Sequence, residues 1–347
     1  MTSLGATLTG KDTQLLACLR WLGQFHVLAY VPLTETVAYN DLADLAGVPP
    51  AQIRRIVRMA ATDGILCSPQ PDRVAHTPLS AQMYKKPSYL DAIRFTAETV
   101  VPTSLRMADA TRRRMRYHQE DANPFRVTTD SSLSLASACE RDHKLRRSAI
   151  TFRRLTSVNR TSAVLEILSS VGLEELEQTV VDMHEGTKQK SEPAYSSQRI
   201  ETSSWLEIQS RAPGTTQNET NAAVYLLHVP DPFFYASSSA HAELRAHFDV
   251  LRTNETVTVI LIADVVPQSG SRGGRGGSPD GPAEARALLN DVLLLQAGHD
   301  VVFDMKRLEA LSEFAREGAD RVTVVNQLSS ASHSLVAFVL RSRSLSS

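Results

Sequence analysis

Three short apolar runs in the second half of the chain constrain the fold most strongly. They occupy residues 179–183, 222–228 and 257–264, and each is apolar along nearly its whole length. A strand with one face in water alternates apolar and polar residues, whereas a continuous apolar run is typical of a strand that helices cover on both faces. The helices expected between and after these runs occupy residues 240–252, 282–296 and 305–317.

Two further strands are expected at residues 321–328 and 334–340, close enough in sequence to pair as an antiparallel hairpin. Parallel strand and helix units that finish in such a hairpin favour an α/β fold with a Rossmann-like sheet of the class I methyltransferase type. Residues 187–221 are polar and rich in turn formers, so we expect irregular structure there.

The first half of the chain predicts two helices joined by a tight turn. Asn40 is the expected N-cap of the first helix, and Gly47 ends it where a positive φ is needed. Pro49 and Pro50 open the second helix, because a proline in the first turn loses no hydrogen bond. The apolar stripe of this second helix consists of Ile53, Ile56, Val57 and Ala60.

Two short β runs follow these helices, at residues 65–67 and 73–77, and residues 69–72 have the composition of a turn. Helix, turn, helix and hairpin in this order predict a winged helix. Mostly helical segments are expected after it, at residues 80–111 and 132–158, with a loop at Asn123 and Pro124.

Residues 14–30 are apolar around most of a helix circumference, so this helix requires burial on nearly all sides. It starts about a dozen residues from Met1, and little preceding chain is present to cover it. Two explanations stay open: a homodimer that buries the N-terminal helices, or a gene start that omits an N-terminal segment.

Charge is divided unevenly along the 347 residues, although 37 basic and 38 acidic side chains nearly cancel. Residues 1–160 carry 22 Lys and Arg against 14 Asp and Glu, and the remaining residues carry 15 against 24. This division indicates either a polyanion partner for the basic half or docking of the halves on each other. No apolar run reaches the roughly 18–20 residues of a membrane span, and the three cysteines lack disulfide or zinc spacing.

The stretch YNDLADLAGVPPAQIRRIVRMAATDGILCSPQPDRVAHTPLS, residues 39–80, resembles the N-terminal domain of fungal S-adenosylmethionine-dependent O-methyltransferases. QLLACLRWLG, NAAVYLLHV and HFDVLRTN resemble one offshoot of that family more closely, the aflatoxin-pathway-type transcriptional co-activators of polyketide gene clusters. The resemblance implies a winged-helix, dimerisation-type domain at residues 1–110, a helical connection at 111–160 and a degenerate methyltransferase-like Rossmann domain at 161–347.

In active methyltransferases of this family, the first strand ends in a turn of the form Val-Asp-Val-Gly-Gly-Gly-x-Gly that lies against the cofactor. Glycine is needed because a Cβ would occupy the cofactor's space. The matching positions here include Asp182, His184, Glu185, Gly186 and Lys188, so one of four glycines remains. The resemblance therefore implies that no cofactor is bound and that the protein is not an enzyme.

Two other family signatures are altered. We find no counterpart of the acidic residue that ends the second strand and holds the ribose hydroxyls, because a polar loop at residues 187–200 takes the place of that unit. The histidine that acts as general base in a His-Asp-Trp sequence falls at His228, followed by Val229 and Pro230. A displaced base and a structural histidine are both open at this position.

Two arginine groups are candidate contact sites. Arg54, Arg55 and Arg58 lie on the polar side of the second predicted helix, where DNA-binding relatives of this motif contact the major groove. They indicate DNA or partner contact, or simply a solvated helix face, and direct DNA binding is not expected. The possible nuclear-import run consists of Arg112, Arg113, Arg114 and Arg116, for which a solvated face is the alternative.

Three further features of the sequence give weaker functional signals. The pairs Arg146-Arg147 and Arg153-Arg154 indicate a polyanion patch or a surface that docks the acidic half. The glycine-rich residues 270–277 lack the spacing of a phosphate loop, and a flexible insertion explains them better than an anion site or a nucleic-acid tether. His184-Glu185 lacks the second histidine of a zinc protease helix, so no metal is expected.

The resemblance implies a transcriptional co-activator that binds a pathway-specific zinc-cluster transcription factor, forms a homo-oligomer through its N-terminal helices and acts in the nucleus, with a cytoplasmic pool also open. No membrane association is expected. Two alternatives remain: an O-methyltransferase with an altered cofactor site that acts on a phenolic polyketide, and an inactive partner subunit of such an enzyme.

Overall fold

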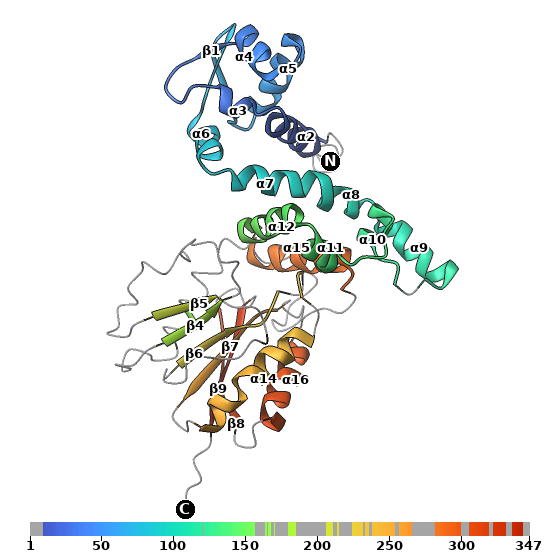
Figure 1. The fold of residues 1–347 in the computed structure, drawn as a ribbon, viewed down its shortest axis with the longest axis vertical. Coiled ribbons are helices and arrows are strands. Elements are labelled where there is room, and N and C mark those ends of the chain that lie inside the picture. The colour runs from blue at the N-terminus through green and yellow to red at the C-terminus, as the bar shows by residue number, and fades with distance from the viewer. Residues whose placement is uncertain are drawn as a thin grey trace, which may run out of the picture. The chain divides into compact units, whose positions relative to one another are not determined.

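The computed structural model divides the chain into two compact units (Figure 1). Unit 1 comprises Met1–Glu120, Pro124–Ser132 and Ser137–Ser157, and unit 2 comprises the rest. The domain boundaries expected from the family resemblance stay a prediction. The structure describes residues 10–119, 121–156, 164, 166–167, 170, 180–184, 206–210, 214, 224–231, 233–235, 238–253, 257–265, 282–299, 305–318, 322–330 and 335–342.

Unit 1 contains two helices and a small antiparallel sheet in the order that the sequence predicts. These elements are β1 (Val37–Ala38), α4 (Tyr39–Ala46), α5 (Pro50–Ala61), β2 (Cys67–Gln70) and β3 (Arg73–Ala75), and the sheet order is β1-β3-β2. The hairpin turn is shorter than predicted, because Gln70 already pairs with Arg73 across it.

The ends of α4 and α5 are set by backbone geometry. Gly47 ends α4 with φ 65°, as predicted, and Pro50 opens α5 after the extended residue Pro49. The prediction for Asn40 was wrong: α4 begins at Tyr39, two residues before the start that an Asn40 cap implies, and its N-cap is Ala38, which makes no side-chain capping bond. β1 runs directly into the helix and fixes its start, so no capping side chain is required.

The core of unit 1 forms around the apolar stripe of α5. Ile53, Val57 and Ala60 are fully buried, and Leu22 and Leu42 lie in the same cluster. These α5 residues are spaced i, i+4 and i+7, which places them on one side of the helix. Ile56, the fourth predicted member of the stripe, packs at the edge of the cluster and is partly buried.

The N-terminal helix is interrupted, contrary to the single helix predicted over residues 14–30. α2 spans Lys11–Gln24 and α3 spans Val27–Tyr30, and His26 between them has φ 53° in the left-handed region. The break turns Val27 and Leu28 into the core. Within one chain the expectation of burial on nearly all sides is not met, because Phe25 and Tyr30 are each 37% exposed.

Helices make up the remainder of unit 1. They are α6 (Pro78–Lys85), α7 (Ser88–Phe95), a π-helical turn (Thr96–Val100), α8 (Val101–Ser104), α9 (Met107–Tyr117), α10 (Pro124–Thr129), α11 (Leu135–Arg141) and α12 (His143–Thr156). α12 packs along α7, with the rings of Phe95 and Phe152 5.3 Å apart. α10 begins at Pro124, where a loop was expected, because a proline suits the first turn of a helix.

Unit 2 contains a six-stranded mixed sheet of order β5-β4-β6-β7-β9-β8. The strands are β4 (Val180–His184), β5 (Leu206–Ser210), β6 (Val224–His228), β7 (Thr258–Asp264), β8 (Val322–Ser329) and β9 (Leu335–Ser342). β5, β4, β6 and β7 run parallel, and β9 pairs antiparallel with both β7 and β8. This confirms the predicted α/β sheet with its antiparallel terminal hairpin.

Helices cover the sheet, as the continuous apolar strands require. α14 (Ser238–Thr253) and α16 (Met305–Gly318) lie side by side on one face (Figure 1), where Leu244 and Leu308 pack against Tyr225 and Leu227 of β6. Val224 and Leu226, the alternate residues of β6, belong to a second buried cluster on the other face. A further helix, α15, spans Pro282–Ala297.

One expectation for this unit was wrong. Residues 187–221 were expected to be irregular, but Leu206–Ser210 within them forms β5, which pairs in parallel with β4. The run Leu-Glu-Ile-Gln-Ser alternates apolar and polar residues, a strand pattern that the surrounding polar stretch obscured. Among the described residues, no helix is long and apolar enough to cross a membrane.

His76 ties three parts of unit 1 together. Its Nε2 lies 3.1 Å from the carbonyl oxygen of Leu28, so this nitrogen carries the proton and donates. Nδ1 lies 2.9 Å from Oγ of Ser80 and accepts from that hydroxyl. Ser80 and Thr77 also form a capping box at the start of α6. Burial lowers the pKa of His76 below its ordinary value of 6.5.

This lowered pKa predicts that unit 1 loses stability in mild acid. The contribution of neutral His76 is fully present above a pH of about 6.5 and is lost as the pH falls below that value toward the folded-state pKa. Thermal unfolding between pH 7.5 and 5.5 should therefore show a larger drop in Tm for the wild-type chain than for His76→Gln. Equal drops in the two proteins would contradict this assignment.

Candidate functional site

The carboxyl ends of the parallel strands form the candidate ligand edge of unit 2. The order of the sheet reverses between β4 and β6, since the strand after β4 in the chain, β5, lies on the opposite side of it. In open α/β sheets, ligands bind outside the carboxyl ends of the strands at such a switch point. The residues that close the four strands are His184, Ser210, His228 and Asp264.

The end of β5 does not fit S-adenosylmethionine. Parallel pairing places Met183 beside Gln209 and His184 beside Ser210, so β5 ends in an amide and a hydroxyl at the level where β4 ends. Glu207 lies three residues earlier, beside Val181. In the methyltransferases that the sequence resembles, a carboxylate at this strand end accepts hydrogen bonds from the ribose hydroxyls, and neither closing residue of β5 can supply one. The second strand is thus present, contrary to the expectation of a replacing loop, but its acidic end is not.

His228 closes β6 inside the sheet. It is 8% exposed, and its strand pairing places it beside Ile262 of β7. The next residue continues the ladder, since the N–H of Val229 donates to the carbonyl oxygen of Ile262 at 2.8 Å. A general base must reach the proton that it removes. Burial within the ladder favours the structural alternative for His228 over the displaced base.

The segment after β6 forms a turn instead of the start of a helix. Asp231 organises it: its carboxylate accepts from the N–H of Phe233 at 3.0 Å, and its carbonyl oxygen accepts from the N–H of Phe234 at 3.0 Å. α14 begins only at Ser238. Asp231 is therefore used to hold a loop.

Only some of the other predicted site residues of unit 2 lie in the part of the chain that the structure describes. Asp182 and His184 lie on β4, within the strand and at its end. Glu185, Gly186 and Lys188 lie outside the described residues, as do residues 187–200 and the glycine-rich residues 270–277. Among the described residues, no three His, Cys, Asp or Glu side chains gather as metal ligands would.

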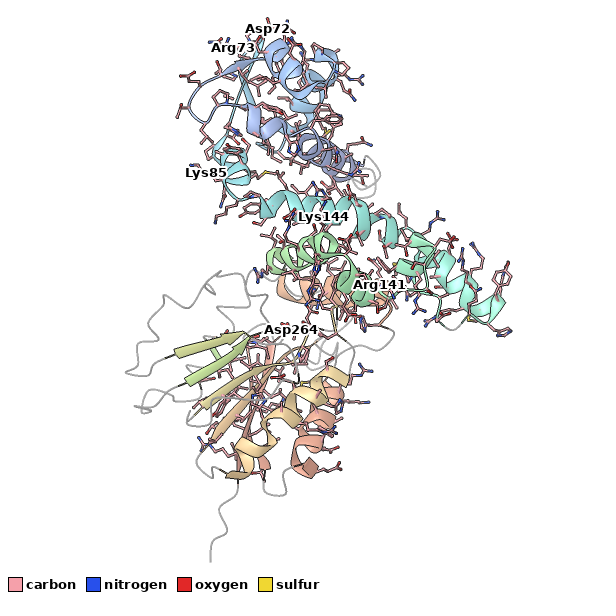
Figure 2. All side chains as sticks on the ribbon, in the orientation of Figure 1. Asp72, Arg73, Lys85, Arg141, Lys144 and Asp264 are labelled. Atoms are coloured by element: carbon pink, nitrogen blue, oxygen red, sulfur yellow. The ribbon has the colours of Figure 1, made fainter. Side chains whose placement is uncertain are left out.

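In unit 1, Arg54 is bound to the hairpin. Its Nη1 donates to Oδ1 of Asp72 at 2.9 Å and to the carbonyl oxygen of Pro71 at 3.1 Å. The guanidinium carbon lies 4.5 Å from the ring centroid of Tyr39, in a cation–π contact. Figure 2 shows Asp72 and Arg73 at the tip of the hairpin, so Arg54 joins α5 to both α4 and that tip. The sequence singled out Arg54 as a contact residue but missed Tyr39 and Asp72, whose signals were only a helix start and a turn aspartate.

Arg55 and Arg58 are exposed on α5, but their surroundings are not basic overall. Residues 39–75, which comprise both helices and the hairpin, carry four arginines and four aspartates. Phosphate contacts supply most of the affinity of a protein for DNA, and they require an excess of positive charge. The helix-turn-helix segment is therefore neutral overall, and contact of Arg55 and Arg58 with DNA or a partner stays a prediction.

Further along the chain, α9 is strongly basic. Arg112, Arg113, Arg114 and Arg116 all lie on this helix. Asp109 pairs with Arg112 and with Arg106, each at 2.9 Å, and the hydrogen bond from Arg106 is the main reason that the pKa of Asp109 is lowered. Arg113 and Arg116 are exposed and form no ion pair with any described residue.

The remaining predicted basic runs lie on α12. Arg147 pairs with Asp91 of α7, with Nε 3.1 Å from the carboxylate, and this ion pair lies beside the buried Phe95 and Phe152 contact. Arg147 therefore joins two helices of unit 1. Arg146, Arg153 and Arg154 also have interaction partners, and the polyanion patch and the docking surface both stay predictions for these pairs.

The fold defines the class of protein. Solved structures that match nearly the whole chain include the mitomycin 7-O-methyltransferase MmcR, with a TM-score of 0.62 at 15% identity over 98% of this chain and 97% of that one. The dimethyltransferase RosA of Streptomyces davawensis matches with a TM-score of 0.66 at 13% identity over 99% and 100%. At such low identity the likeness shows the fold alone, which is that of class I methyltransferases.

Sequence comparison identifies the family within this class. The chain is 32% identical to the dothistromin biosynthesis regulatory protein aflJ of Dothistroma septosporum, over 94% of its own length and 81% of that protein. It is 33% identical to the trypacidin cluster transcriptional coactivator tpcD of Aspergillus fumigatus, over 91% and 76%. The aflatoxin cluster coactivator aflS of Aspergillus flavus matches at 30%, over 95% and 82%. No protein-family model matches. The chain belongs to the family of aflatoxin-type transcriptional coactivators.

The contacts of Arg54 predict a structural effect that its neighbour Arg55 lacks. Arg54→Ala removes the cation–π contact and the bonds to the hairpin, and it should lower the free energy of unfolding by roughly 0.5–1 kcal/mol, since Asp72 is 80% exposed and its ion pair is screened. Arg55→Ala should change it by less than about 0.5 kcal/mol. Urea denaturation of the full chain measures both, and an equal loss for the two variants would contradict this role.

Proposed function

We propose that this protein is a non-catalytic transcriptional coactivator of a fungal secondary-metabolite gene cluster, which acts by binding a pathway-specific zinc-cluster transcription factor. The relatives from Aspergillus bear the name of cluster coactivators, and the chain is similar to them over most of its length. The proposal places the protein in the nucleus, where such a factor binds promoters, and includes self-association through the N-terminal helices.

The observation that carries the non-catalytic part of this proposal is the pairing of β4 with β5. Since Met183 and His184 lie beside Gln209 and Ser210, the strand end that holds the cofactor ribose in active relatives has no carboxylate. His228, the one histidine that corresponds to a family base, is buried in the ladder beside Ile262. On this proposal, the carboxylate that holds the ribose and an accessible general base are both lost, while the sheet that would carry them is retained.

Retention of the fold supports an interaction role. A protein that no longer binds a cofactor still requires its buried core to fold, and the central strands β6 and β7 are buried and largely apolar. Rigid elements hold surface side chains in fixed positions, which lowers the entropic cost of binding a partner. The proposed coactivator thus uses the surfaces of a methyltransferase fold in place of its catalytic centre.

The second candidate function is that of an O-methyltransferase, or of an inactive subunit that pairs with one. The similarity of the fold to MmcR and RosA favours it, because both of those proteins are named as methyltransferases. The strand-end residues Gln209 and Ser210 weigh against it.

Deletion of the gene in its native host separates these functions. The coactivator proposal predicts that transcripts of the neighbouring biosynthetic genes fall together, and that the protein co-precipitates with the zinc-cluster factor encoded nearby. Reintroduction of the wild-type gene serves as the control. Unchanged transcripts with loss of a single methylated product would show the enzyme instead, and co-precipitation of an active methyltransferase alone would show the inactive subunit.

A further inference from the structure

We infer that α9 and the turn before it form a docking surface for an acidic segment of another protein that also carries apolar side chains. This inference rests on the proposed function, in which the segment belongs to the transcription factor. The proposed function does not say which surface binds the transcription factor. This inference places that contact on residues 105–117, here called the arginine helix surface.

Exposed apolar side chains are the first observation. Leu105, Met115 and Tyr117 are 77%, 76% and 66% exposed, the largest exposures of any large apolar side chain in the described chain. All three fall within thirteen residues of each other. Single exposed apolar residues are ordinary on protein surfaces, but a cluster of the most exposed ones indicates a contact site.

The kind of positive charge is the second observation. Residues 105–117 contain five arginines, one aspartate and no lysine. Solvated helix faces mix Lys with Glu, whereas interfaces are enriched in Arg, Met and Tyr and depleted in Lys. The guanidinium group is weakly hydrated and binds a carboxylate through two parallel hydrogen bonds, so it suits a contact that excludes water.

The distribution of partners within unit 1 is the third observation. α9 packs mainly against α10, and Ala110 is its buried residue. Asp109 forms ion pairs with Arg106 and Arg112, but Arg113 and Arg116 have no ion-pair partner among the described residues. The surface therefore presents, near Met115 and Tyr117, two charges that no described acidic residue pairs with.

These three observations select the partner. Excess arginine attracts carboxylates or phosphates, but DNA phosphates offer nothing for exposed Leu, Met and Tyr side chains to cover. An acidic segment with interspersed Leu or Phe satisfies both, since its carboxylates pair with the arginines and its apolar side chains cover Leu105, Met115 and Tyr117. We therefore assign the surface to an acidic and apolar peptide segment and not to nucleic acid.

The test uses the purified full-length chain and three fluorescein-labelled probes. The first probe is a 20-residue peptide in which Asp and Glu alternate with Leu and Phe, the second has Ser in place of each Leu and Phe, and the third is a 20-base-pair DNA duplex. Fluorescence anisotropy in 150 mM salt should show binding of the first probe, with the second and third at least about tenfold weaker. Tighter binding of the duplex than of the first probe would overturn the inference.

Matched variants place the binding on this surface. Arg113→Glu with Arg116→Glu, and separately Met115→Ser with Tyr117→Ser, should each weaken binding of the first peptide about tenfold or more. The charge control is Lys85→Glu with Lys86→Glu, on and just after α6 (Figure 2 labels Lys85), and the apolar control is Leu45→Ser on α4, where Leu45 is 56% exposed. Both controls should bind within about twofold of the wild-type chain. Equal loss in variants and controls would show unspecific attraction and overturn the inference.

Light scattering identifies a competing occupant. If the variants of α9 converted a dimer to a monomer and the wild-type chain failed to bind the peptide, a second copy of the chain would cover this surface and the inference would be wrong. An unchanged mass together with weakened peptide binding would support it.

Expression of the same variants in the deletion strain separates this inference from the proposed function. Loss of cluster transcripts with the α9 variants, while a fluorescent tag shows them in the nucleus, would support the docking surface. Full transcription with both α9 variants would overturn it and leave the coactivator function standing. Exclusion of the arginine variant from the nucleus, with peptide binding intact, would assign the run to import and overturn the inference. A deletion without effect on transcripts would instead refute the proposed function, whatever the peptide measurements show.

Discussion

The parallel pairing of β4 with its two neighbours is the constraint on which the rest of unit 2 depends. It brings the end of β4 level with Ser210 of β5 and sets Met183 beside Leu227 of β6, so the residues that end three strands share one edge of the sheet. The pairing of the strands fixes these positions. The closing residues of β5, Gln209 and Ser210, carry no carboxylate, and His228 at the end of β6 is buried.

In unit 1, charged residues of the helix-turn-helix segment stabilise its structure, and the net positive charge lies elsewhere in the unit. The helix-turn-helix segment is electrically neutral, and Arg54, Asp72 and Tyr39 are used to hold it together. The excess positive charge lies on helices outside this segment, on α9 and α12. The net positive charge of unit 1 therefore lies outside the two helices α4 and α5 and the hairpin.

Much of the fold could be predicted from the sequence, because burial imposes strong patterns. The apolar runs at β6 and β7 predict buried strands. Gly47 predicts the end of a helix, and Pro50 predicts the start of the next one. β5 could not be predicted, since a strand of only five residues within a long polar stretch gives a weak alternation. The break at His26 was also hidden, because a left-handed histidine has no sequence signal and is imposed by the packing of Val27 and Leu28.

Part of the candidate site could likewise be predicted from the sequence, and part could not. Loss of the glycine turn was visible in the sequence, but the absence of an acidic strand end could be located only after β5 was paired with β4. Helix periodicity places Arg54 on a polar face, but its bonds to Pro71 and Asp72 could not be predicted, because periodicity does not place the hairpin against α5. Exposure of Leu105, Met115 and Tyr117 was equally invisible, since periodicity does not tell which side of a short helix remains uncovered.

Calorimetric titration of the full-length chain with S-adenosylmethionine tests the central claim most directly. The account predicts no saturable heat at ligand concentrations up to about 1 mM, under conditions in which an active O-methyltransferase of the same fold binds normally. Saturable binding with a micromolar Kd, in protein free of any contaminating enzyme, would contradict the claim that this sheet has kept its shape and lost its cofactor.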